Sequence, residues 1–209
     1  MRVVAGVPML ERALRQLAAS PHVALIVVAA PADQVDSLSA RLTEAEPSID
    51  VAVVAGGSSR QQSVSAALAH VPDTYDYVLV HDAARPFVPV DVIDRVVAAL
   101  ESGAQAVIPV LPVADTIKSV DAGGRVTGTP NRSQLRAVQT PQGFPREVLL
   151  RIHAAATDDT TDDAGLAEAA GLAVETVLGD PMAFKITHPF DLWVAESLAA
   201  ADEGQATHD

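Results

Sequence analysis

The chain has 209 residues, 27 of them acidic and 14 basic, which gives a formal net charge of −13. This length fits one domain, spanning residues 1–209, that can bury a substantial core without disulfides or a structural metal. The acidic balance argues against a nucleic-acid surface, and the absence of cysteine excludes disulfides and thiolate zinc sites. No apolar run suits a membrane span or a secretory signal, so we expect a cytoplasmic protein.

Helical and strand-like patterns alternate along the first half of the chain. The spacing of apolar residues predicts helices at 8–19, 31–42, 63–69 and 90–102 and strands at 23–29, 51–55, 77–80 and 106–110. The strand at 23–29 is continuously apolar, which is typical of a parallel strand covered on both faces. This alternation predicts an α/β fold with a doubly wound, mostly parallel, Rossmann-like sheet.

The alternation stops after residue 112. Two short β-branched runs flank Asp121-Ala-Gly-Gly124 and predict a β-hairpin. Because inserted arms often exchange between subunits, we interpret residues 113–138 as a dimerisation arm. Helices at 145–155, 163–170 and 189–201, a strand at 174–178 and a short extended segment at 184–187 complete the expected elements. The polar residues 202–209 predict a flexible tail.

The most informative segment is Val78-Leu-Val-His-Asp-Ala-Ala-Arg-Pro86, where an apolar strand runs directly into charged residues. Ligands bind beyond the carboxyl ends of strands in open parallel sheets. A carboxylate such as Asp82 can hold a divalent metal there, and a guanidinium such as Arg85 can bind an anion. A helix cap and a surface salt bridge are the alternatives. We expect His81 to be structural, because no second histidine stands at metal-ligand spacing from it.

Two further segments could contribute to a site. Gly56-Gly-Ser-Ser-Arg-Gln-Gln-Ser63 joins an expected strand to a helix, and its glycines and free N–H groups would allow a ligand to approach. Taken alone, it is more simply an ordinary βα turn. Lys185 lies in a short apolar segment, which is costly unless its ammonium group reaches an anion or water, so it is a candidate phosphate ligand.

Taken together, these segments resemble the 2-C-methyl-D-erythritol 4-phosphate cytidylyltransferases, a nucleotidyltransferase family of the non-mevalonate isoprenoid pathway. In chain order, the resemblance rests on Pro8-Met-Leu-Glu11, Ala55-Gly-Gly57, Arg60, Ser63-Val64, Val80-His-Asp-Ala-Ala-Arg-Pro86, Val113-Ala-Asp-Thr-Ile-Lys118, Ala137-Val-Gln-Thr-Pro-Gln142, Thr161-Asp-Asp-Ala164 and Phe184-Lys-Ile-Thr187. Each piece alone is weakly diagnostic, but their joint order covers nearly the whole chain. The resemblance implies that CTP and a sugar-alcohol phosphate react and that pyrophosphate leaves.

The resemblance also implies roles on the nucleotide side of the site. Asp82 would be a catalytic residue and would hold Mg²⁺, the implied cofactor, beside the CTP phosphates. Gly57, Ser58 and Ser63 would face the cytosine, and Ala83 would line the ribose.

On the sugar side, the resemblance implies that Arg85 approaches the erythritol part of the substrate. Thr116 and Arg132, on the arm of a partner subunit, would bind the methylerythritol phosphate. Thr140 and Lys185 would complete the phosphate pocket, with Lys185 also catalytic. Members of the family are homodimers with interlocked arms, in agreement with the expected hairpin.

The chain departs from the family at its first residues. Family members open with a strand and a glycine-rich loop of the type Pro-Ala-Ala-Gly-x-Gly-x-Arg, followed by Pro-Lys, which wraps the triphosphate. Met1-Arg2-Val3-Val4-Ala5-Gly6 aligns just after this element. We therefore expect a sheet without one inner strand, with two open edges, and impaired activity of the chain as written. A start codon assigned too late would explain the difference.

Two alternative functions stay open at this point. A ribitol-5-phosphate cytidylyltransferase would use the same fold and metal. A non-catalytic, dimeric nucleotide-binding protein would explain the missing loop.

Overall fold

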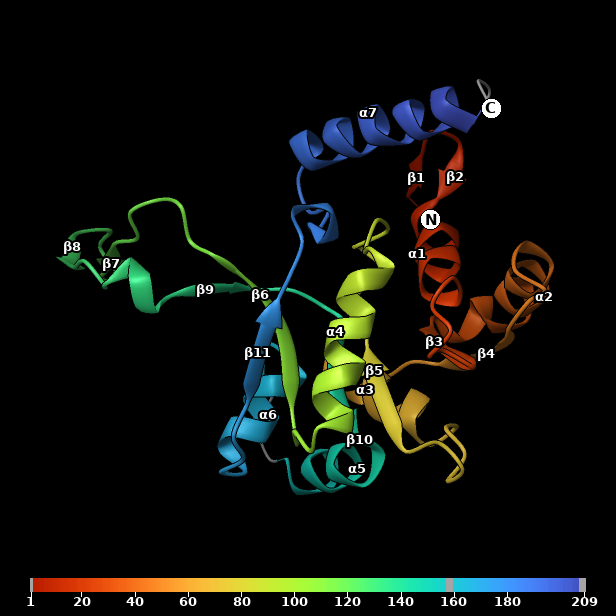
Figure 1. Cartoon of the computed structure of the whole chain (residues 1–209), viewed down its shortest axis with the longest axis horizontal. Helices are drawn as coiled ribbons and strands as arrows, with labels where there is room; N and C mark the ends of the chain where they lie inside the picture. Colours follow the sequence, from red (N-terminus) through yellow and green to blue (C-terminus); the bar gives the residue numbers. More distant parts are fainter. Residues whose placement is uncertain (1, 157–159, 207–209) are drawn as a thin grey trace.

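The computed structural model describes residues 2–156 and 160–206 of a mixed α/β fold (Figure 1). The helices are α1 Met9–Ala18, η1 Ala32–Gln34, α2 Val35–Ala45, α3 Arg60–Leu68, α4 Val90–Glu101, η2 Arg132–Gln134, α5 Arg146–Ala155, α6 Asp163–Ala169, η3 Pro181–Ala183 and α7 Pro189–Ala206. The strands are β1 Val3–Val4, β2 Val7–Pro8, β3 Leu25–Ala30, β4 Asp50–Ala55, β5 Tyr77–Val80, β6 Val107–Pro112, β7 Ser119–Val120, β8 Val126–Gly128, β9 Arg136–Val138, β10 Gln142–Pro145 and β11 Glu175–Leu178.

The larger sheet has the strand order β11-β6-β10-β5, with β9 also paired to β6. β11 runs parallel to β6, whereas β10 runs antiparallel to both of its neighbours, β6 and β5. β5, β6 and β11 therefore run in the same direction, and their carboxyl ends meet at one edge of the sheet. Asp82 follows the first of these strands at that edge.

The central strand β10 is absent from the sequence expectations, and its residues explain why. Gln142-Gly-Phe-Pro145 contains a glycine and ends in proline, both of which are depleted in strands. The glycine is needed here because a Cβ at Gly143 would lie 2.5 Å from Val96 Cγ1 of α4. Because successive residues of a strand face opposite sides, α4 covers one face of the sheet and Phe144 points to the other.

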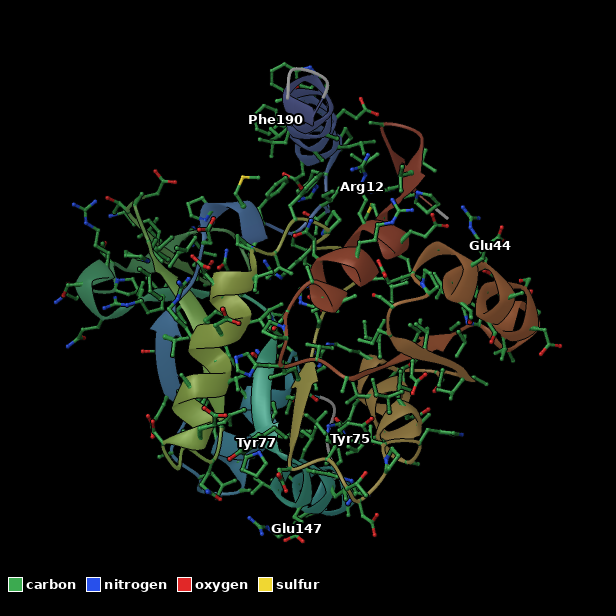
Figure 2. All side chains as sticks on the ribbon, turned by 45° about the vertical axis from the view of Figure 1, so that its right-hand side comes forward. Arg12, Glu44, Tyr75, Tyr77, Glu147 and Phe190 are labelled. Atoms are coloured by element: carbon green, nitrogen blue, oxygen red, sulfur yellow. The ribbon has the colours of Figure 1, made fainter. Side chains whose placement is uncertain are left out.

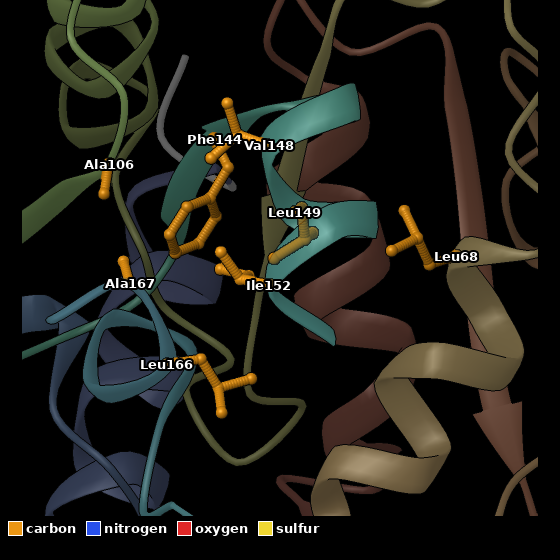
Figure 3. Packing of buried hydrophobic residues seen from close by; sticks show 8 residues of the cluster. All are labelled: Leu68, Ala106, Phe144, Val148, Leu149, Ile152, Leu166 and Ala167. Atoms are coloured by element: carbon orange, nitrogen blue, oxygen red, sulfur yellow. The ribbon is translucent and has the colours of Figure 1, made fainter. Parts of the chain in front are cut away.

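Phe144 is fully buried at the centre of the main hydrophobic cluster (Figure 3). The cluster joins α3, α5 and α6 to β10 and consists of Leu68, Ala106, Phe144, Val148, Leu149, Ile152, Leu166 and Ala167. Truncating a buried phenylalanine to alanine typically costs about 3–5 kcal/mol. The same helices carry the loop before α3 and the acidic turn before α6, so the packing of this cluster also fixes polar residues near Asp82.

A second sheet consists of β3 and β4, which pair in parallel from Leu25↔Asp50 to Ala30↔Ala55. In the described part of the chain, β3 pairs only with β4, and β5 pairs only with β10. Figure 2 shows the two sheets as separate blocks. An apolar cleft of about 390 Å³ lies between them, lined by residues of β3, β5, α1 and α3. β3 and β5 are thus two open strand edges that face each other across the cleft, as expected from the sequence.

The expected hairpin is present between β6 and β9. β7 and β8 pair antiparallel, and Asp121 to Gly124 form the turn, with the Asp121 N–H donating to Arg125 O over 2.9 Å. The whole segment extends away from the body of the molecule (Figure 1). Val120 is 58% exposed and Val126 is 61% exposed, so this hairpin has apolar side chains without a core of its own.

The closing helix differs from its expected extent. α7 continues through Ala206, past Ala201, so the first part of the expected tail is helical. Residues 207–209 of that tail, and residues 157–159 between α5 and α6, lie outside the described residues. Within residues 2–156 and 160–206, no helix combines the length and apolar character that crossing a membrane requires.

Candidate functional site

Asp82 lies at the carboxyl end of β5 with three cations around its carboxylate. Lys185 Nζ is 2.9 Å from Asp82 Oδ2, Arg60 Nε is 3.8 Å from Oδ1, and Arg85 Nε is 3.9 Å from Oδ2. Partial burial by itself would raise the pKa of Asp82. The hydrogen bond and charge of Lys185, with the charges of Arg60 and Arg85, outweigh this effect and hold the pKa below 3.8. Asp82 is therefore an anion at neutral pH.

Lys185 reaches Asp82 because the residues on either side of it are anchored in the core. Phe184 stacks on Phe87 with ring centroids 6.3 Å apart, and buried Ile186 donates its N–H to Ala84 O over 2.8 Å. In extended backbone the intervening side chain points the opposite way. The lysine is therefore directed at the carboxylate, in agreement with the expectation that its ammonium group would find an anion.

His81 and Thr140 form hydrogen bonds that hold the backbone around Asp82 in place. His81 Nε2 lies 3.1 Å from Arg85 O, and a carbonyl can only accept, so Nε2 carries the hydrogen. His81 Nδ1 must then accept from the Thr140 hydroxyl, 3.0 Å away. The same hydroxyl accepts the Asp82 N–H over 3.1 Å. Burial, aided by the charge of Arg85 and opposed by the hydrogen bonds and the charge of Asp82, lowers the pKa of His81 to about 4 and keeps it neutral, consistent with a structural role.

Arg85 joins three segments of the chain. Its Nη1 donates to Ala183 O over 2.7 Å and its Nη2 to Val138 O over 3.2 Å, while its Nε faces Asp82. Burial lowers the pKa of Arg85, against the opposing effect of the Asp82 charge. Two of its donors are thus occupied by carbonyls, so the guanidinium ties the Asp82 loop to the base of the arm and to η3.

These side chains line a pocket of about 190 Å³ at the edge of the larger sheet. The lining residues are Arg60, Asp82, Arg85, Val138, Gln139, Thr140, Gln142, Thr161, Asp162 and Lys185. The arginines and the lysine, with amide and hydroxyl groups in the same lining, suit a phosphorylated ligand. Four residues expected at the site from the sequence, Asp82, Arg85, Thr140 and Lys185, thus line one pocket, and their roles stay predictions.

The loop before α3 folds tightly onto the helix. Ser59 caps α3 by accepting the Gln62 N–H, and Ser63 Oγ accepts the Gly57 N–H over 3.1 Å. Ser58 donates through both its N–H and its hydroxyl to Gln62 Oε1. A Cβ at Gly57 would lie 2.2 Å from Gln62 Cβ, so glycine is required there.

The larger cleft lies between α3 and Asp82. Its lining includes Ser63 together with Asp82 and the exposed Ala83. Gly57 and Ser58 are exposed close by in sequence. Their expected contact with cytosine, and that of Ala83 with the ribose, stay predictions.

The arm residues lie apart from this group. Thr116 and Arg132 are exposed, and Arg132 Nη1 donates to Ala114 O over 2.7 Å within the arm. Neither residue lines the pocket beside Asp82, and the arm extends away from the body of its own chain (Figure 1). Their expected place in a partner subunit's site stays a prediction.

Two charged residues, Arg60 and Asp163, have no role among those expected from the sequence. Arg60 faces Asp82 and also lies 2.8 Å, through Nη2, from Asp163 Oδ2. Asp163 is 1% exposed. Arg60 occurs in the resembling motif, but no local pattern in the chain pairs it with a carboxylate in the distant Thr161-Asp-Asp-Ala164 segment.

The donor set around Asp82 limits the kind of metal site that it can form. In the described part of the chain, no group of three His, Cys, Asp or Glu side chains could hold a metal ion. Mg²⁺, however, is often bound by one or two carboxylates together with substrate phosphates. One anionic carboxylate in a phosphate-sized pocket fits a metal that arrives with a nucleotide, rather than a preformed metal cage.

A family model described as 2-C-methyl-D-erythritol 4-phosphate cytidylyltransferase matches residues 1–200. The chain belongs to this family. The family resemblance drawn from the sequence is therefore confirmed.

Named relatives and solved structures agree with the membership. A protein of this name from Streptomyces coelicolor is 49% identical, with 96% of this chain and 77% of the relative covered. One from Saccharopolyspora erythraea is 53% identical, with 94% and 88% covered. The crystal structure of the Thermus thermophilus protein has 36% identity and a TM-score of 0.77, covering 95% of this chain and 92% of that one. The Rossmann-like nucleotidyltransferase fold is thereby established for this chain.

Proposed function

We propose that this protein joins CTP and 2-C-methyl-D-erythritol 4-phosphate to give 4-diphosphocytidyl-2-C-methyl-D-erythritol and pyrophosphate. The observation that supports this most directly is the anionic Asp82 with Lys185 and two arginines in one phosphate-sized pocket. Family membership supplies the cytidylyltransferase activity. The residue roles below extend that activity to this chain.

In the proposed reaction, a phosphate oxygen of the sugar-alcohol phosphate attacks the α-phosphorus of CTP in line. The bond from that phosphorus to the bridging oxygen breaks, and pyrophosphate leaves with that oxygen. Because two anions must meet, the task of the protein is to position them and neutralise their charge. No protein nucleophile is required, and His81, which stays neutral, is not needed as an acid.

The proposed roles follow from the contacts of each side chain. Lys185 binds phosphate and stabilises the charge that develops on it. The Thr140 hydroxyl and the Arg85 guanidinium hold the backbone and carboxylate of Asp82 in place. Asp82 would hold Mg²⁺, which supplies charge neutralisation on the nucleotide phosphates when bound. The sugar-side contacts expected for Arg85 and Thr140 stay part of the proposal.

Pyrophosphate release from CTP tests the proposed function. Offering 2-C-methyl-D-erythritol 4-phosphate and ribitol 5-phosphate in parallel separates the proposed substrate from its nearest rival, which the family comparison does not favour. Asp82→Asn and Lys185→Ala should each lower kcat/KM by about 10²-fold or more, while the exposed Asp36→Asn and Arg151→Ala serve as matched controls. Unchanged turnover in Lys185→Ala would contradict its phosphate role.

Calorimetry with CTP and Mg²⁺ tests the second rival. Binding of the nucleotide without turnover of either sugar phosphate would favour a non-catalytic nucleotide-binding protein. Turnover by this chain would exclude that function.

We also propose that the protein is a homodimer formed through the 113–138 arm. Both strands of the hairpin carry exposed apolar residues, Val120 and Val126, and neither residue belongs to the main hydrophobic cluster. Packing against a second copy would remove this surface from water and would bring Thr116 and Arg132 to the partner subunit's site. A cytoplasmic location stays a prediction, compatible with the absence of cysteine.

A further inference from the structure

Arg60 is shared unequally between two carboxylates. It is the first residue of α3, and its side chain is 33% exposed and lines the 190 Å³ pocket. The nearer carboxylate is Asp163, at 2.8 Å, and the farther one is Asp82, at 3.8 Å. The guanidinium therefore lies beside Asp82 without closing on it.

Asp163 belongs to a chain of hydrogen bonds that runs from the interior to the surface of α3. Its Oδ1 lies 2.8 Å from Nε2 of His153, which is 4% exposed, and His153 Nδ1 lies 2.9 Å from Ser65 Oγ. A Ser-His-Asp series of this kind can activate a nucleophile, but Ser65 is exposed on α3, and neither Ser65 nor His153 lines the pocket beside Asp82. The series instead holds the Asp163 carboxylate in one position.

This arrangement has a consequence for Asp82. An arginine 3.8 Å from a carboxylate needs only a small rotation to form a paired, bidentate contact, which is one of the stronger polar interactions in proteins. Such a pair would also occupy Oδ1 of Asp82, the oxygen that Lys185 leaves open to the metal. The closer Asp163 carboxylate, itself bound to His153, competes for the same guanidinium and keeps it off Asp82.

We propose that Arg60 binds the nucleotide phosphates and that Asp163 is a positioning residue, which holds the Arg60 guanidinium beside Asp82 and leaves Oδ1 of that carboxylate open to the metal. This inference rests on the proposed function, since it assumes that CTP and Mg²⁺ bind at Asp82. It assigns a role to Arg60, one of the three cations around Asp82, and to the Asp163 carboxylate that restrains it.

Two single variants and their combination test the proposal by calorimetry. Arg60→Met should weaken CTP binding at saturating Mg²⁺ by about tenfold or more, because a charge-assisted hydrogen bond is lost. Its affinity for cytidine, which has no phosphate, should not change. Asp163→Asn should raise the Mg²⁺ concentration that half-saturates CTP binding by about tenfold, because Arg60 then pairs with Asp82.

The double variant separates restraint from a general structural effect. With Arg60 already replaced, Asp163→Asn should no longer raise the half-saturating Mg²⁺ concentration, which should return to that of Arg60→Met. The exposed Arg151→Met and Asp36→Asn change charge in the same way and should behave like the parent protein. Thermal unfolding checks that each variant is folded.

Several outcomes would overturn the inference. Unchanged CTP affinity in Arg60→Met would refute the phosphate contact of Arg60. A half-saturating Mg²⁺ concentration that is unchanged in Asp163→Asn, or raised equally in the double variant, would refute the restraint of Arg60 by Asp163. If Asp163→Asn does not fold, Arg60→Lys decides, because a retained charge should recover part of the CTP affinity lost in Arg60→Met. A parent protein that does not bind CTP with Mg²⁺ refutes the proposed function itself.

Discussion

Replacing Thr140 with valine gives the sharpest test of how the site is built. Valine has nearly the same shape as threonine but lacks the hydroxyl, which donates to His81 Nδ1 and accepts the Asp82 N–H. Thr140 is only 5% exposed, so water cannot easily replace either contact. Each buried polar group left unpaired costs about 1–3 kcal/mol, and two such groups give a destabilisation of about 2–6 kcal/mol.

Urea unfolding of the parent protein, Thr140→Val and Thr140→Ser would measure this cost. The serine variant keeps the hydroxyl and should recover most of the loss. A free energy of unfolding for Thr140→Val within about 0.5 kcal/mol of the parent would refute the reasoning. If that variant is fully stable and yet binds the sugar phosphate weakly, Thr140 acts as a substrate ligand and does not support Asp82.

Three further predictions concern pH, packing and association. The pKa of His81 is about 4 in the folded protein and 6.5 in the unfolded chain, so as the pH falls the unfolded state binds a proton before the folded state does. The free energy of unfolding should therefore be at its full value above pH 6.5 and fall by about 3 kcal/mol as the pH drops to 4. His81→Gln should flatten this pH dependence in urea titrations, and an unchanged pH dependence would contradict the assignment. Phe144→Ala should destabilise the fold by about 3–5 kcal/mol in the same assay, and a loss below 1 kcal/mol would show that the cluster in Figure 3 is not the main core. Val120→Asp with Val126→Asp should give a monomer in light scattering, whereas the exposed Ala98→Asp on α4 should not; a dimer that survives the arm substitutions would rule out the arm as the interface.

The sequence predicts the residues of the site better than their interactions. Asp82 directly after an apolar strand, and Lys185 between two apolar residues, are local patterns, and both side chains meet in the structure. The tasks of His81 and Thr140 are not local. The hydrogen bond from the Thr140 hydroxyl to His81 Nδ1 joins two chain segments that only the folded sheet brings together.

The fold shows the same division between local and distant information. Helices and parallel strands follow from periodicity, because each buries a continuous apolar face. β10 has a pattern that favours a turn, and it becomes the central strand because α4 packs directly on Gly143 and the core surrounds Phe144. Asp163 similarly looks like part of an acidic turn until it is seen beside Arg60.

The cleft between β3 and β5 also determines where the backbone is protected from water. In each strand, every second N–H group points away from its single described partner strand and toward the cleft. These amides lie at the middle of the molecule, yet no strand in the described part of the chain accepts their hydrogen bonds. Hydrogen–deuterium exchange should therefore be fast along a line through the interior and slow on either side of it, the reverse of the usual gradient from surface to core.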